Sequence, residues 1–83
     1  LSQNYPNPFN PVTNINFSLP NSSDVKLAVY DMLGQQVALL ANGKFDAGSY
    51  TIDFDASQLT SGIYFYTLSA GSFKETKKMM LIK

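Results

Sequence analysis

Apolar and polar residues alternate along most of the chain, which is the pattern of strands that bury one face and expose the other. The first such run covers 15–19 and ends at Pro20, because proline cannot donate a ladder hydrogen bond. Further runs of the same period follow at 25–30, 37–39, 50–54 and 63–68, with a final strand that ends at Lys83. With turn signals between them, these runs predict an all-β fold, an antiparallel β-sandwich of about seven short strands.

Short segments between these runs carry the residue types that turns require. Asp31-Met32-Leu33-Gly34 is predicted to connect two strands of a hairpin, with Gly34 at positive φ, and Ala70-Gly71-Ser72-Phe73 is a second tight-turn candidate. Asn42-Gly43 and Gly48 mark a looser stretch with further turn signals. The segment from Asp55 to Leu59 shows no alternation and predicts a single helical turn capped by Asp55.

The first eleven residues differ from the rest, since they hold three of the four prolines. Proline fixes its own φ and restricts the residue before it, so this segment is expected to be extended and stiff. Tyr5 and Phe9 are too apolar for a disordered linker, and both are expected to pack against the sandwich as a clamp. We therefore predict one domain over 1–83, with a Pro-rich segment at 1–11 and the sandwich at 12–83.

Composition narrows the possible functions more than it narrows the fold. The 83 residues are 45% hydrophobic and 13% aromatic, with six positive charges against six negative ones and no Cys or His. A neutral chain without Arg argues against nucleic-acid binding, and no apolar run approaches the ~20 residues that span a bilayer. Without Cys or His, disulfides, thiolate metal sites and the usual general base are absent. Because the chain begins at Leu1 without a signal peptide, we interpret it as a module of a larger protein.

The run that follows Gly62 holds the densest aromatic cluster of the chain. The Gly62-Ile63-Tyr64 spacing matches the tyrosine corner of immunoglobulin-like sandwiches, in which the Tyr hydroxyl bonds to backbone a few residues upstream, here near Leu59. Tyr64, Tyr66 and Leu68 would then face the core, with Phe65 on the opposite face. The alternative is an aromatic binding platform built from residues 64–66, but alternate residues on a central strand of so small a domain are mostly buried.

Candidate chemistry elsewhere is sparse. Asp53 and Asp55 are two positions apart and could share one strand face, as acid–base pairs or calcium ligands would. No Asp/Asn-Gly loop of calcium spacing and no second acidic cluster accompanies them, so we favour a solvated strand end with a cap. Ser and Thr are scattered, and no Lys is placed beside a Ser on a recognisable turn. We therefore predict a domain that is not an enzyme and has no metal, cofactor or small-molecule substrate.

The last ten residues, 74–83, hold four of the six lysines. Lysines on an edge strand protect a sheet against chance pairing, and an edge strand is also where a partner can add a strand. The two interpretations are compatible, because lysines around the apolar 79–82 run would repel random edges and attract an acidic partner. Either Met79 and Leu81 or Met80 and Ile82 point inward, and the pattern leaves both open.

Four blocks in order carry a resemblance to a known family. They are Gln3-Asn4-Tyr5-Pro6-Asn7-Pro8-Phe9-Asn10-Pro11, Val29-Tyr30-Asp31-Met32-Leu33-Gly34-Gln35-Gln36-Val37, Leu59-Thr60-Ser61-Gly62-Ile63-Tyr64-Phe65-Tyr66, and Lys77-Lys78-Met79-Met80-Leu81-Ile82-Lys83. Over nearly its whole length the chain resembles the type A C-terminal sorting domain of the type IX (Por) secretion system of Bacteroidetes. It is also similar to the immunoglobulin-like domain of flagellar hook-capping proteins, which share the second and third blocks.

The first resemblance implies a C-terminal immunoglobulin-like domain that directs an upstream cargo protein through the type IX machinery. It implies transit through the periplasm, then the outer-membrane surface or the medium, and often removal by a sortase-like protease. The translocon would recognise the terminal basic strand, which falls on Lys77, Lys78, Met79, Met80, Leu81, Ile82 and Lys83. Gly62 and Tyr64 would form the structural corner, and we expect a monomer.

Two other functions compete with this one. The first is a carbohydrate-binding or adhesive module of a secreted enzyme, which a flat row of surface aromatics would favour, with Phe45, Phe65 and Phe73 as candidates. The second is a structural spacer. The exposure of those aromatic side chains bears on the first alternative.

Overall fold

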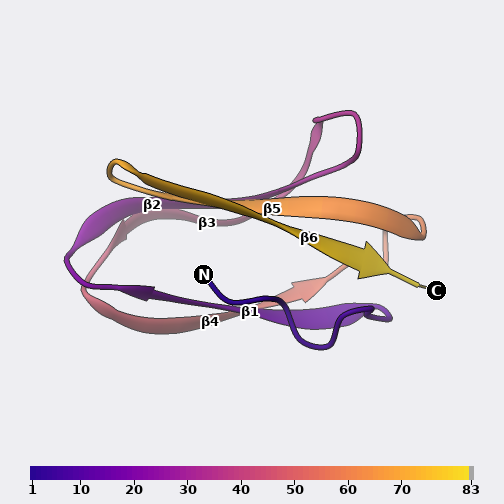
Figure 1. Cartoon of the computed structure of the whole chain (residues 1–83), viewed down its shortest axis with the longest axis horizontal. Coiled ribbons are helices and arrows are strands. Elements are labelled where there is room, and N and C mark those ends of the chain that lie inside the picture. Colours follow the sequence, from indigo (N-terminus) through magenta and orange to yellow (C-terminus); the bar gives the residue numbers. More distant parts are fainter. Residues whose placement is uncertain (83) are drawn as a thin grey trace.

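A computed structural model describes residues 1–82 and shows six strands in two layers (Figure 1). One antiparallel sheet has four strands in the order β3-β2-β5-β6, and the other pairs β1 with β4. The strands are β1 (Val12–Leu19), β2 (Ser23–Tyr30), β3 (Gln36–Phe45), β4 (Gly48–Asp55), β5 (Gly62–Ala70) and β6 (Phe73–Leu81). The all-β, sandwich-like prediction is confirmed, with six strands in place of about seven.

The core lies between the two sheets and is filled by the alternate residues that the sequence pattern marks. From the four-stranded sheet, Val25, Leu27 and Val29 of β2 are buried, as are alternate residues of β5. The two-stranded sheet adds Ile15 and Phe17 of β1 from the opposite layer. A period of two places every second side chain on one face of a strand, so β1, β2 and β5 each supply a mainly apolar row to the shared interior.

Both predicted tight turns are confirmed. Gly34 has a φ of 82°, its N–H bonds to the Asp31 carbonyl at 3.1 Å, and the Asp31 carboxylate accepts two further backbone N–H groups. At the second turn β5 ends at Ala70 and β6 begins at Phe73, with Gly71 at a φ of 61°. Only glycine adopts these left-handed conformations without a steric cost, so the two glycines predicted both turns from the sequence.

The interpretation of Asn42-Gly43 as a turn is wrong, because both residues lie inside β3 and pair with β2. The register between β2 and β3 shifts twice, so that β3 carries an extra residue at two places, Val37 and Leu40. The chain instead changes sheets between Phe45 and Gly48.

The predicted helical turn at 55–59 is also wrong in type, although its cap is present. The Ser57 N–H bonds to the Asp55 carboxylate at 2.9 Å, and the Leu59 N–H bonds to the Ala56 carbonyl at 2.9 Å. One reverse turn therefore suffices to carry the chain from β4 towards β5, and no helical turn forms there. Asp55 stabilises that turn by accepting a backbone N–H two residues on.

The Pro-rich N-terminal segment (residues 1–11) packs against both sheets, as predicted for a clamp, but with only one of its two aromatic residues. Phe9 is 1% exposed, whereas Tyr5 is 76% exposed, so the expectation that Tyr5 packs inward is wrong. Backbone hydrogen bonds join Ser2 and Tyr5 to the edge of β1. Phe9 bonds instead to the end of β6, in the other sheet. The segment therefore bridges the two layers.

Candidate recognition surface on the terminal strand

The terminal strand β6 is one of the two edges of the four-stranded sheet, as predicted. Met79 and Leu81 are each 1% exposed, whereas Met80 and Ile82 are 39% and 49% exposed. The structure thus decides the facing that the sequence left open, with the odd-numbered pair inward. Lys83 lies outside the described residues, so its predicted part in recognition has no structural counterpart here.

Of the three lysines of this strand, Lys74 and Lys78 lie on the outer face of the sheet and Lys77 lies on the inner side. Lys78 lies on the outer face, with its backbone opposite Phe65 of β5. Lys77 lies on the inner side, half-buried, and its ammonium is 3.7 Å from the Glu75 carboxylate. Among residues 1–82, Lys74 and Lys78 each present a positive charge without a carboxylate partner, whereas Lys77 is paired with Glu75.

The outward backbone groups of β6 are occupied near its end by the Pro-rich N-terminal segment. In an antiparallel pair, alternate residues direct both backbone groups away from the partner strand. Phe9 receives a hydrogen bond from Ile82 N–H at 2.9 Å and donates one to the Met80 carbonyl at 3.0 Å. The Asn7 side chain accepts the Met80 N–H at 3.0 Å, and the Gln3 side chain donates to the Lys78 carbonyl at 2.8 Å. Over 78–82 the predicted open edge is therefore covered.

A buried tyrosine anchors the start of this covering segment. Tyr66 of β5 is 0% exposed, and its hydroxyl donates to the Ser2 carbonyl at 2.8 Å and accepts the Asn4 N–H at 2.8 Å. Burial raises the pKa of the Tyr66 phenol; the Asn4 hydrogen bond lowers it, and the charge of Glu75 raises it further. The neutral hydroxyl is therefore the form that holds the segment in place.

Two buried polar residues that sequence reasoning missed hold the segment in shape. The Asn4 side-chain amide donates to the Thr13 hydroxyl at 3.0 Å and to the Pro6 carbonyl at 3.1 Å. The Thr13 hydroxyl in turn donates to the same Pro6 carbonyl at 2.8 Å. Asn4 and Thr13 are 2% and 1% exposed. A lone Asn before a Pro-rich run carries no periodic signal, so only the folded chain reveals this network.

At the start of β5, the Tyr64 hydroxyl donates to the Thr60 carbonyl at 2.7 Å. This bond runs four residues upstream and lies next to Leu59, where a tyrosine corner would place it. Gly62 is the first residue of β5, with its backbone opposite Leu81 of β6. The Tyr64 hydrogen bond ties down the loop that leads into β5, the strand with which β6 pairs.

The two carboxylates that could have carried chemistry do not form a site. Asp53 and Asp55 are both exposed, and Asp55 caps the turn that follows it. Throughout residues 1–82, no three metal-binding side chains come close enough together to hold an ion. This arrangement agrees with a solvated strand end rather than with an acid–base pair.

The three aromatic residues proposed for a carbohydrate platform lie in different environments. Phe45 is half-buried against Tyr50 and Phe17, with ring centroids 5.1 Å and 6.1 Å away. Phe65 is half-buried on the outer face of β5, whereas Phe73 is 50% exposed at the start of β6. No flat row of rings results, so nothing in this part of the chain favours sugar binding through stacked aromatics.

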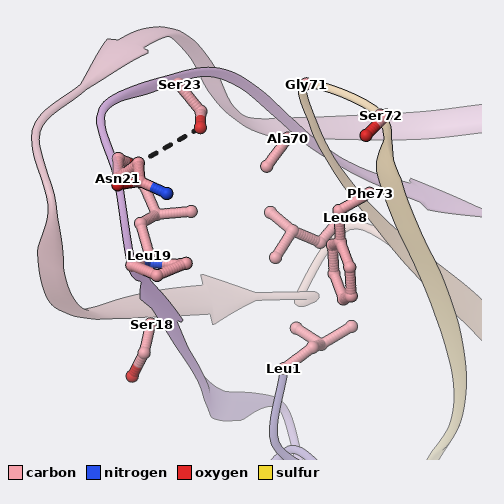
Figure 2. A pocket seen from close by; sticks show the side chains of 11 residues that line it. Leu1, Ser18, Leu19, Asn21, Ser23, Leu68, Ala70, Gly71, Ser72 and Phe73 are labelled. Atoms are coloured by element: carbon pink, nitrogen blue, oxygen red, sulfur yellow. Dashed lines mark hydrogen bonds between the residues drawn. The ribbon is translucent and has the colours of Figure 1, made fainter.

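Phe73 instead borders a pocket of about 470 Å³ at the open end of the sandwich (Figure 2). Figure 2 shows the side chains of Leu1, Leu19, Leu68 and Phe73 converging across the gap between the two sheets. The polar side chains at the margin are short, and the Ser23 hydroxyl already donates to the Asn21 carbonyl at 3.3 Å. The pocket is an incompletely closed end of the core, without charged side chains in its lining.

The comparisons with known proteins bear directly on this surface. Residues 3–83 match the model of the secretion system C-terminal sorting domain, so the match includes both the covering segment and β6. No curated protein and no solved structure matches the chain. Within residues 1–82 we find no helix suited to crossing a membrane.

Domains of the matched family are C-terminal signals that sort cargo proteins for type IX secretion, and the family is not a catalytic one. The secretion system recognises such a domain, and its cargo lies upstream in the same polypeptide. The expected destination is the cell surface or the extracellular space. Because the match spans 3–83, the chain belongs to the family of secretion system C-terminal sorting domains.

Proposed function

We propose that residues 1–83 form one non-catalytic sorting domain in which the secretion machinery reads the exposed residues of the terminal strand. The observation that carries this proposal is a contact between the two ends of the family match. The first matched residues lie along β6, where Gln3, Asn7 and Phe9 bond to its backbone. The first and last blocks of the sequence thus form one surface.

The seven residues expected to be recognised divide into two groups by their exposure. Lys78, Met80 and Ile82 are exposed, and Lys77 is half-buried, so these four can contact a receptor directly. Met79 and Leu81 are in the core, so their contribution is to hold the strand in place. Lys83 remains a predicted contact.

We further propose that the domain carries its cargo through the periplasm and that a sortase-like protease then removes it. The domain acts as a sorting signal that the secretion machinery binds. It catalyses no reaction and binds no cofactor, nucleic acid or small molecule. The balanced charge and the lack of Cys and His support this proposal. The bulged β3 and the covered end of β6 support a monomer, because neither offers a long regular edge to a second copy.

The test is made in the organism that carries the full-length protein. Deleting residues 1–83 should leave the cargo in the periplasm, whereas fusing these residues to a periplasmic passenger should bring the passenger to the surface or the medium. Fractionation with immunoblotting measures both. Normal export of the cargo after the deletion would refute the proposed function. Removing only 76–83 is a poorer test, because it also removes Met79 and Leu81 from the core.

A further inference from the structure

The outer face of β6 and the covering segment meet at a shallow groove of about 200 Å³. It is lined by the apolar residues Pro8 of the segment, Ile63 of β5, and Met79 and Met80 of β6, together with Asn7 and Lys78. These residues are far apart in sequence and form one surface only when the segment lies along the strand. We call this surface the seam groove.

Strand addition cannot explain recognition at this place while the segment is bound. A strand that pairs with 78–82 needs the Lys78 carbonyl, both Met80 backbone groups and the Ile82 N–H. All four are already bonded to the Pro-rich segment. At 78–82 a partner must therefore read side chains on the outer face, since the backbone edge there is occupied.

The lysines on the outer face of β6 indicate that the partner carries negative charge. Lys78 has Lys74 on the same face of β6, and Lys26 of β2 lies in the same row as Lys74 across Ser69. Among residues 1–82, neither Lys78 nor Lys74 forms an ion pair, and the one carboxylate of β6, Glu75, lies on the other side and binds Lys77. A positively charged face beside an apolar groove is complementary to an apolar side chain next to a carboxylate.

We propose that the seam groove is the docking site for an acidic segment of the secretion machinery, which inserts an apolar side chain between Pro8, Ile63 and Met80 and places a carboxylate on Lys78. This inference rests on the proposed function and names the partner chemistry of the same surface. The apolar side chain supplies the buried central contact, and the lysine supplies orientation and attraction. The Pro-rich segment is thus part of the recognised surface as well as a clamp.

The test uses the full-length cargo protein in its own organism, with single substitutions on exposed positions. Met80→Glu places a carboxylate in the groove, and Lys78→Glu reverses the charge at its margin. Each should lower export at least about tenfold, the loss expected when a central interface contact is removed. Lys78→Arg keeps the positive charge, so the export of this variant should stay within about twofold of that of the unchanged protein. Leu39→Glu and Lys44→Glu are matched controls on exposed positions of β3, and they should leave export unchanged.

Limited proteolysis of the full-length protein shows whether each variant domain remains folded. If Met80→Glu proves protease-sensitive, Ile63→Thr is the second variant, because it changes the same groove from β5. Threonine is β-branched and suits a strand, so this variant should stay folded and should also lower export. Normal export of the folded Met80→Glu, Lys78→Glu and Ile63→Thr variants, with export still lost on deletion of 1–83, would overturn the seam groove and leave the sorting function intact. Normal export after that deletion would instead overturn the sorting function itself.

Discussion

The two edge strands of the four-stranded sheet, β3 and β6, avoid unwanted pairing by different means. β3 carries two bulges, at Val37 and Leu40, and Ala41 is its one buried residue. β6 keeps an unbroken register with β5 over its whole length, and it buries both Met79 and Leu81. A regular strand with apolar residues is the better template for another chain, and this is the strand that the Pro-rich segment covers.

The difference shows what the covering segment contributes. A bulged strand is a poor template because its outward groups are out of step, so β3 needs no cover. A regular strand such as β6 keeps its outward backbone groups in step, so its edge needs a cover that blocks pairing with another chain. The Pro-rich segment meets this need, because it binds the edge through Gln3, Asn7 and Phe9 and leaves the outer side chains free.

The largest expected loss of stability comes from removing the Phe9 side chain, which anchors the Pro-rich segment in the core. Phe9→Ala should lower the free energy of unfolding by about 3–5 kcal/mol, because a fully buried ring is lost and a cavity remains. Denaturant unfolding of the domain measures the change. Tyr5→Ala is the matched control, since Tyr5 is 76% exposed, and it should change stability by less than about 0.5 kcal/mol. Equal losses in the two variants would show that the segment is not seated through Phe9.

A smaller loss should follow when the anchor hydroxyl is removed. Tyr66→Phe leaves the Ser2 carbonyl and the Asn4 N–H without their partner, which should cost about 1–3 kcal/mol. Tyr30→Phe removes a hydroxyl from a half-buried residue on the outer face and should stay within about 0.5 kcal/mol. Urea titrations of both variants give the comparison. If the Tyr66→Phe variant were as stable as the unchanged domain, the hydroxyl would not hold the segment.

The same hydroxyl predicts a dependence on alkaline pH. Because burial raises the pKa of Tyr66 above the ordinary 10.0, the unfolded chain loses this proton first as the pH rises. Its contribution to stability is therefore complete below about pH 10 and is lost progressively as the pH rises toward the folded-state pKa. Thermal melts at several pH values should show this extra alkaline loss, and the loss should be absent from the Tyr66→Phe variant. Parallel curves for the two proteins would contradict the assignment.

The smallest effect is expected when the hydrogen bond from the Met80 N–H to the Asn7 side chain is removed. Asn7→Ala removes the acceptor of the Met80 N–H and should cost about 0.5–1.5 kcal/mol, towards the lower end because the bond is exposed. Hydrogen exchange should then become faster at the Met80 amide, while the Ile82 amide, bonded to the Phe9 backbone, changes less. Asn10→Ala, on an exposed neighbour, serves as the control. An unchanged exchange rate at Met80 would mean that Asn7 does not protect the edge.

Local pattern was sufficient for much of this fold. A period of two marks the buried rows of β2 and β5, since each row depends only on the strand's own geometry. Gly34 and Gly71 marked two turns because a left-handed backbone excludes most other residues. The facing of β6 stayed open because four apolar residues in a row, 79–82, have no alternation to read.

Apart from the turn at 55–59, the errors and omissions depend on contacts between distant segments. Asn42-Gly43 has the composition of a turn, but pairing with β2 keeps it extended. Tyr5 and Phe9 are both aromatic, and the course of the segment across the two sheets decides that Phe9 is the buried one. The cover over β6 joins residues more than 70 positions apart, so no window along the chain contains it.

The direction of the covering segment gives the domain a mechanical property. Phe9 and Leu81 pair in parallel, unlike the antiparallel pairs within the two sheets. When two parallel strands are pulled apart by their opposite ends, the hydrogen bonds between them are loaded together, in shear. A force that draws the start of the chain one way and the end of β6 the other is therefore shared between the two Phe9 hydrogen bonds. The same seam pulled sideways would open one bond at a time, so this domain should resist traction along its length better than peeling.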